Sequence, residues 1–67
     1  MEIQVRDNKN FIIGTCVDNG NTIRATHIRN GYAGVYYKST NMTMDRYGKL
    51  YCYGDGTQSL IRDMERN

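Results

Sequence analysis

Residues 11–38 read FIIGTCVDNGNTIRATHIRNGYAGVYYK, and this stretch decides the fold. It holds two Asn-Gly pairs, Asn19-Gly20 and Asn30-Gly31, each between runs rich in Ile, Val, Thr and Tyr. A two-residue hairpin turn of type I′ needs positive φ at both central positions, and Asn-Gly is a pair that adopts it readily. The stretch therefore predicts three antiparallel strands, at about residues 11–17, 22–29 and 32–38.

The same alternation of turns and β-rich runs continues on both sides of this stretch. Clusters of Asn, Asp and Gly recur at 7–10, 45–48 and 54–56, and the chain has no Pro. Such spacing is typical of an antiparallel meander, so further strands are predicted at about 2–6, 42–45 and 49–53. After Gly56 the apolar residues Leu60, Ile61 and Met64 recur at helical spacing, which predicts a helix over about 57–66.

The predicted fold is mainly β, of the α+β class. It is a small antiparallel meander of five to six short strands with one C-terminal helix packed on one face. The 67 residues are taken as a single compact domain, 1–67, because a chain of this length can build only one core.

The two Asn-Gly turns also predict which side chains share a face of the sheet. The more uniformly apolar face is assigned to the core, beneath the helix. Its members are Phe11, Ile13, Val17, Ile28, Ala33 and Val35, joined by Met42, Met44, Leu50 and Cys52 from the last hairpin.

The opposite face carries the candidate binding residues, which are His27, Arg29, Tyr32, Tyr36 and Lys38. Tyr and Arg are enriched at protein-binding hot spots, and the same set suits single-stranded nucleic acid, with bases stacked on the rings. A third interpretation is a solvated face whose tyrosines follow strand propensity. Gly34 is predicted to lie opposite His27, so the middle of this face should form a shallow trough for a partner's side chain.

The charge and composition of the chain indicate which class of partner is favoured. Nine Lys and Arg against seven Asp and Glu give a net charge of +2 without a basic cluster, which favours a protein partner over nucleic acid. No apolar run has the length of a membrane span, and the first residues lack the apolar core of a signal peptide. We therefore expect no membrane partner, a cytoplasmic location and reduced thiols at Cys16 and Cys52.

Catalysis, metals and cofactors are not predicted. His27 is the only histidine, and no Asp or Glu falls on its predicted face to orient the ring. Two Cys and one His do not supply the four ligands of a zinc site. The segment at 54–57, Gly-Asp-Gly-Thr, lacks the Lys and the glycine spacing of a phosphate-binding loop. We expect no enzyme activity, no metal and no cofactor.

In size and composition the chain resembles the compact, single-domain accessory proteins of phages and mobile elements, which include inhibitors of host defence. The resemblance implies a non-catalytic protein that acts by occupying the surface of a partner protein, in the host cytoplasm if it is phage-encoded. The alternative is a small nucleic-acid-binding regulator that uses the Tyr, Arg and Lys face. The oligomeric state stays open, with a homodimer among the alternatives.

Overall fold

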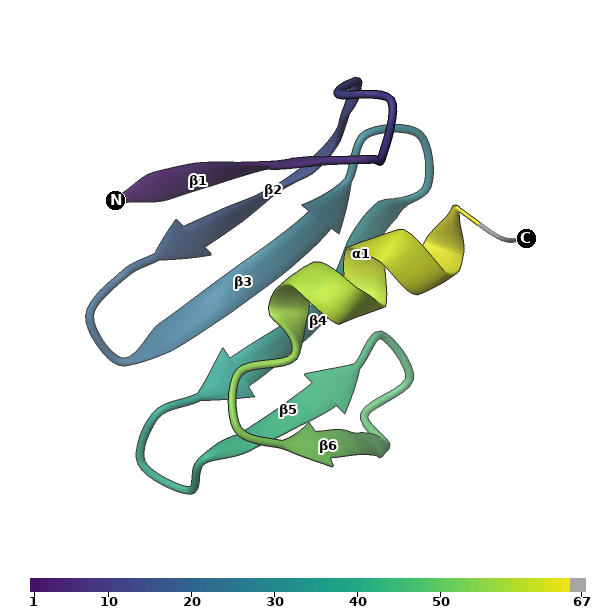
Figure 1. The fold of residues 1–67 in the computed structure, drawn as a ribbon. Helices are drawn as coiled ribbons and strands as arrows, with labels where there is room; N and C mark the ends of the chain where they lie inside the picture. The colour runs from purple at the N-terminus through teal and green to yellow at the C-terminus, as the bar shows by residue number, and fades with distance from the viewer. Residues whose placement is uncertain (66–67) are drawn as a thin grey trace.

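A computed structural model describes residues 1–65 of the chain. Six antiparallel strands pair in chain order into one sheet, and one helix crosses one face of it (Figure 1). The elements are β1 (Glu2–Arg6), β2 (Ile12–Asp18), β3 (Thr22–His27), β4 (Gly31–Tyr37), β5 (Met42–Asp45), β6 (Leu50–Tyr53) and α1 (Thr57–Met64). The predicted fold class is confirmed. The predicted end of the helix, residue 66, lies outside the described residues.

The first Asn-Gly turn forms one residue later than predicted. Asn19 donates its backbone N–H to the Thr22 carbonyl at 3.1 Å, so the two loop residues are Gly20 and Asn21. Gly20 has φ +104°, and its N–H is held by the Asp18 carboxylate at 2.9 Å. A turn with Gly at its first central position needs positive φ only there, which explains the shift. The cross-strand pairs move by two residues as a result, and Val17 lies opposite Arg24 instead of Thr22.

The second turn is a three-residue loop over residues 28–30, closed by Gly31 at φ +80°. Register shifts also interrupt the ladders between β1 and β2 and between β3 and β4. They leave Ile13 and Ala33 as extra residues in their strands, and both are buried. The bulge at Ala33 also places Tyr32 opposite Thr26, on the face turned away from α1.

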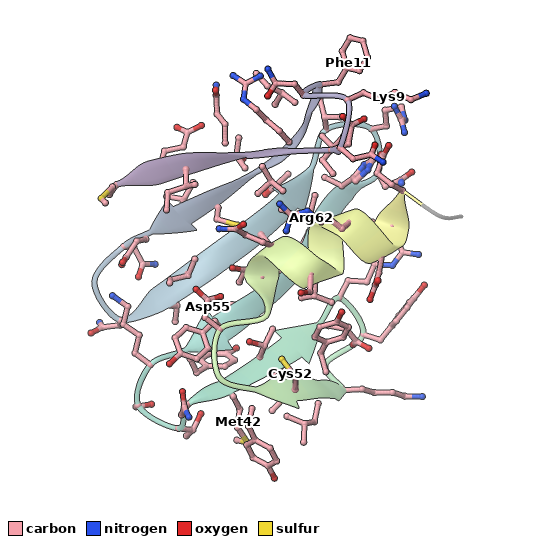
Figure 2. All side chains as sticks on the ribbon, viewed as in Figure 1. Lys9, Phe11, Met42, Cys52, Asp55 and Arg62 are labelled. Atoms are coloured by element: carbon pink, nitrogen blue, oxygen red, sulfur yellow. The ribbon has the colours of Figure 1, made fainter. Side chains whose placement is uncertain are left out.

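The helix covers the opposite face from the one predicted. Among the residues assigned to the core, Phe11 and Ile28 are 66% and 62% exposed, Val17 is exposed and Val35 is only half-buried. Phe11 stands at the β1–β2 turn, at the outer end of the sheet (Figure 2). The residues buried beneath α1 are instead Gly14, Cys16, Ala25, His27 and Gly34, with Val5, Ile13 and Ala33 around them.

Small residues explain why α1 chooses this face. A Cβ atom added at Gly14 would lie 2.8 Å from Ile61 Cγ2, and one added at Gly34 would lie 2.6 Å from Leu60 Cδ1. The two glycines therefore let the helix approach the sheet closely enough for Leu60 and Ile61 to be buried. The stripe of Leu60, Ile61 and Met64 faces the sheet as predicted, with Met64 half-buried.

A buried threonine fixes the connection that delivers α1 to this face. The Thr43 hydroxyl, fully buried on β5, donates to the Gly54 carbonyl at 2.6 Å and accepts from the Gly56 N–H at 2.9 Å. Gly56 is the N-cap residue of α1, and the Asp55 carboxylate before it accepts from the Thr57 N–H at 3.0 Å and from the Thr57 hydroxyl at 2.6 Å. These contacts hold the segment that leads from β6 into α1.

Candidate functional site

The five predicted binding residues do not form one open face. His27 is buried beneath α1 and Tyr36 is half-buried on the same side, where its hydroxyl donates to Asn41 Oδ1 at 2.8 Å. Tyr32 lies on the uncovered side because of the bulge at Ala33. Lys38 is held by the Asp18 carboxylate at 2.9 Å. The expectation of a shared exposed surface is therefore wrong.

His27 fastens the end of α1 to the β3–β4 turn. Its Nδ1 accepts backbone N–H groups from Arg29 at 3.1 Å and from Asn30 at 3.2 Å. Its Nε2 contacts Glu65 Oε2, which also receives Arg29 Nη2 at 2.6 Å. Because Nδ1 accepts two N–H groups, the ring proton is assigned to Nε2, which donates to the carboxylate. Both ring nitrogens are thus engaged by groups of the protein itself.

Glu65 is the orienting carboxylate that sequence reasoning missed. It lies 38 residues from His27 along the chain, so no local motif joins the two. The helical period indicates the position of Glu65, because it follows Ile61 by four residues and therefore falls on the stripe that faces the sheet. An acidic residue on an apolar stripe indicates a buried polar partner on the facing sheet, and His27 is that partner.

Acid should weaken the contacts that Glu65 makes with His27 and Arg29. The hydrogen bond from His27, and then that from Arg29, hold the pKa of the Glu65 carboxyl below its ordinary value of 4.5, against the opposing effect of desolvation. The unfolded chain then binds a proton at Glu65 more readily than the folded protein. The stabilisation is present above about pH 4.5 and is lost as the pH falls through the folded-state pKa.

We therefore expect Glu65→Gln to lose part of this acid sensitivity. The melting temperature of the wild type should fall more steeply than that of Glu65→Gln between about pH 5 and pH 3. Lys38 also lowers the pKa of Asp18, so Asp18→Asn is the control for the other shifted carboxyl. Identical pH profiles for the wild type and Glu65→Gln would contradict the assigned role.

The face turned away from α1 is the remaining candidate for binding. The cross-strand pairs of β2 to β6 align one row of side chains across it: Val17, Arg24, Val35, Met44 and Leu50. A second row beside it contains Thr22, Tyr37, Met42 and Tyr53. Val17, Tyr37, Leu50 and Tyr53 are all exposed. This is the apolar side that sequence analysis assigned to the core, and no described element covers it (Figure 1).

Arg24 is the charged residue of the first row, between Val17 and Val35. Its guanidinium carbon lies 4.9 Å from the centroid of the Tyr32 ring, a cation–π contact. Arg24, Tyr32, Val35 and Tyr37 line a shallow hollow of about 390 Å³ together with Asn19 and Thr22. Burial raises the pKa of the Tyr32 phenol, so this ring stays neutral. None of the ion pairs among residues 1–65 includes Arg24.

Other chemistries find little support among the described residues. Within residues 1–65 no three His, Cys, Asp or Glu side chains gather as a metal site. Cys16 and Cys52 are free thiols, and burial raises the pKa of the Cys16 thiol. The same part of the chain contains no helix long and apolar enough to cross a membrane.

Comparisons of the chain with protein-family models, with curated proteins and with solved structures give no significant match.

Proposed function

We propose that this chain is a non-catalytic binding protein that occupies the surface of a partner protein with the uncovered face of its sheet. The observation that carries the proposal is the placement of the apolar rows outside the core. Val35, Met44 and Leu50 lie side by side on that face, while the helix is packed over glycines and alanines. Contiguous exposed apolar surface on a small domain marks an interaction site.

Arg24 supplies the chemical requirement that the partner must meet. A guanidinium buried at an interface without a counter-charge is costly, whereas a carboxylate that meets it in fork geometry forms a strong pair. The partner should therefore present an Asp or Glu surrounded by apolar side chains. Tyr32 and Tyr37 would flank this carboxylate with rigid rings, the residue type that dominates binding hot spots.

A photo-crosslinking residue tests the proposal. We would place it at position 37, on the uncovered face, and at position 58, on the exposed side of α1, in cells that naturally contain this chain. The proposal expects a protein captured from position 37 and not from position 58. Capture only from position 58, or no capture at position 37, would contradict it.

The captured protein is then purified and its affinity measured for matched variants. Arg24→Glu should weaken binding by about 30-fold or more, a hot-spot effect, whereas Gln58→Ala should bind like the wild type. Circular dichroism should show the same fold for both variants. Equal affinities for Arg24→Glu and the wild type would overturn the proposal. Capture of nucleic acid, with affinity falling steeply as salt is added, would favour the regulator instead.

A further inference from the structure

The outer edge of β1 has unpaired backbone groups in a regular pattern. Among the described elements, β1 is an edge strand that bonds to β2 alone, and it forms the upper edge of the sheet in Figure 1. Met1 exchanges two hydrogen bonds with Asp18, at 2.7 and 3.0 Å. In an antiparallel ladder such pairs alternate, so Ile3 and Val5 also bond to β2. The N–H and C=O groups of Glu2, Gln4 and Arg6 therefore point away from the sheet.

The sequence of this edge, EIQVR, is complementary to itself in the antiparallel direction. With Gln4 opposite Gln4 of a second copy, Glu2 faces Arg6 and Ile3 faces Val5. Opposite charges in directly facing positions stabilise a strand pair, and so do facing apolar residues. The register also satisfies the backbone, because every residue with outward N–H and C=O groups then meets another such residue.

Four of the five side chains of this edge are exposed: Glu2, Ile3, Gln4 and Arg6. Ile3 is 47% exposed, whereas Val5, on the same face, is buried in the protein's own core, so Ile3 supplies the apolar surface that the contact would cover. Glu2 takes part in none of the ion pairs among residues 1–65, and neither does Arg6. Arg6 Nη1 donates to the Asn10 carbonyl at 2.9 Å, which leaves further donors of the guanidinium for a carboxylate. Arg62 Nη2 lies 3.5 Å from the Arg6 carbonyl, longer than a normal hydrogen bond.

We infer that two copies of this chain associate by pairing β1 with β1 in antiparallel orientation, about a two-fold axis at Gln4. The axis is perpendicular to the sheet, so the two six-stranded sheets join into one, with both helices on the same side. The partner is a second copy because the charge order of the strand fits its own reverse. Edge strands often carry charges, especially lysine, that prevent pairing with a second strand. Glu2 and Arg6 have opposite signs at matching positions.

The mass of the full chain in solution tests this inference. Light scattering coupled to size-exclusion chromatography, over a concentration series, should show a dimer that dissociates on dilution. Glu2→Arg and Arg6→Glu each place like charges opposite one another, and each should weaken the dimer by about tenfold or more. The double variant Glu2→Arg/Arg6→Glu restores opposite charges and should recover the dimer. Lys9→Glu, in the β1–β2 turn, changes the net charge as Arg6→Glu does and should leave the dimer intact.

Gln4→Pro tests the backbone contact directly. Proline removes an N–H that β2 does not use, so the monomer should keep its circular dichroism spectrum while the dimer is lost. A monomer at all concentrations for the wild type would overturn the inference. A dimer that persists in Gln4→Pro and in both single charge variants would also overturn the inference. If that dimer were instead lost in Arg24→Glu, the contact between the two copies would lie on the uncovered face. The inference is independent of the proposed function, because Glu2→Arg should still bind the partner captured at position 37.

Discussion

Replacing Ile61 by alanine is expected to lower the free energy of unfolding by about 3 to 5 kcal/mol, the upper range for a buried aliphatic side chain. Ile61 is fully buried and lies against Gly14, so the truncation leaves a cavity between helix and sheet. A domain of this size has a total stability of roughly 3 to 10 kcal/mol. Urea denaturation followed by circular dichroism should show a much lower midpoint, and the variant should be partly unfolded in water.

Ile28→Ala is the matched control for this experiment. It removes the same atoms from a side chain that is 62% exposed, so the free energy of unfolding should change by less than about 0.5 kcal/mol. The sequence pattern predicts Ile28 in the core, whereas the structure exposes it, so the two variants together test which face of the sheet is buried. Similar costs for Ile61→Ala and Ile28→Ala would show that α1 does not cover the face described above.

Gly34→Ala should be as damaging as the loss of Ile61. The added methyl group would lie 2.3 Å from the Met44 carbonyl oxygen and 2.6 Å from Leu60 Cδ1, and Gly34 has φ +155°. Overpacking costs about 1 to 3 kcal/mol and a strained backbone position a similar amount, so we expect a loss of about 3 to 5 kcal/mol. Thermal melting followed by circular dichroism should show a large fall in the melting temperature.

Gly20→Ala separates the two causes of this loss. Gly20 also has positive φ, +104°, but a Cβ atom there would meet nothing within 4 Å. This variant should therefore carry only the backbone cost, about 1 to 2 kcal/mol. The difference between the free energies of unfolding lost in Gly34→Ala and in Gly20→Ala measures the contribution of the close approach between helix and strands. If the two variants were equally stable, close packing of α1 against β4 and β5 would be excluded.

The strands, their order and the helix could be predicted because they depend on local patterns. Turn residues divide the chain, β-branched and aromatic residues fill the strands, and the helix stripe shows its own period. The pairing of each strand with its neighbour in sequence then follows from short turns. Each predicted strand lies within two residues of the observed one at both ends.

The buried face could not be predicted from hydrophobicity alone. The rule that the more apolar face forms the core assumes that the partner layer is large, but here that layer is one helix of eight residues. Such a helix gains most by approaching closely, and close approach requires small residues such as Gly14, Ala25 and Gly34. The bulges at Ile13 and Ala33 added a second error, because each shifts the alternation within its strand.

The five candidate binding residues were placed on one exposed face for the same reason. The predicted pairing of Gly34 with His27 is wrong, because Gly34 lies opposite Ala25 and His27 lies opposite Gly31. Leu60 packs against Gly34 and Ile61 against Gly14, so the chain's own helix covers these small residues. The expected features of a binding surface, rings with a cation among them, are present on the other face as Arg24, Tyr32 and Tyr37. Their types were recognisable in the sequence, whereas their face depended on packing.

The meander also has a consequence for the order in which the molecule is assembled. Every strand pairs with the next one along the chain, so each hairpin can form with a short loop closure and little delay. The element that closes the core, α1, comes after all six strands in the sequence. During synthesis no face of the sheet is therefore shielded from solvent by α1 until residues 57–64 have left the ribosome. Among the described elements, α1 is therefore the one that turns a set of hairpins into a cooperatively folded protein.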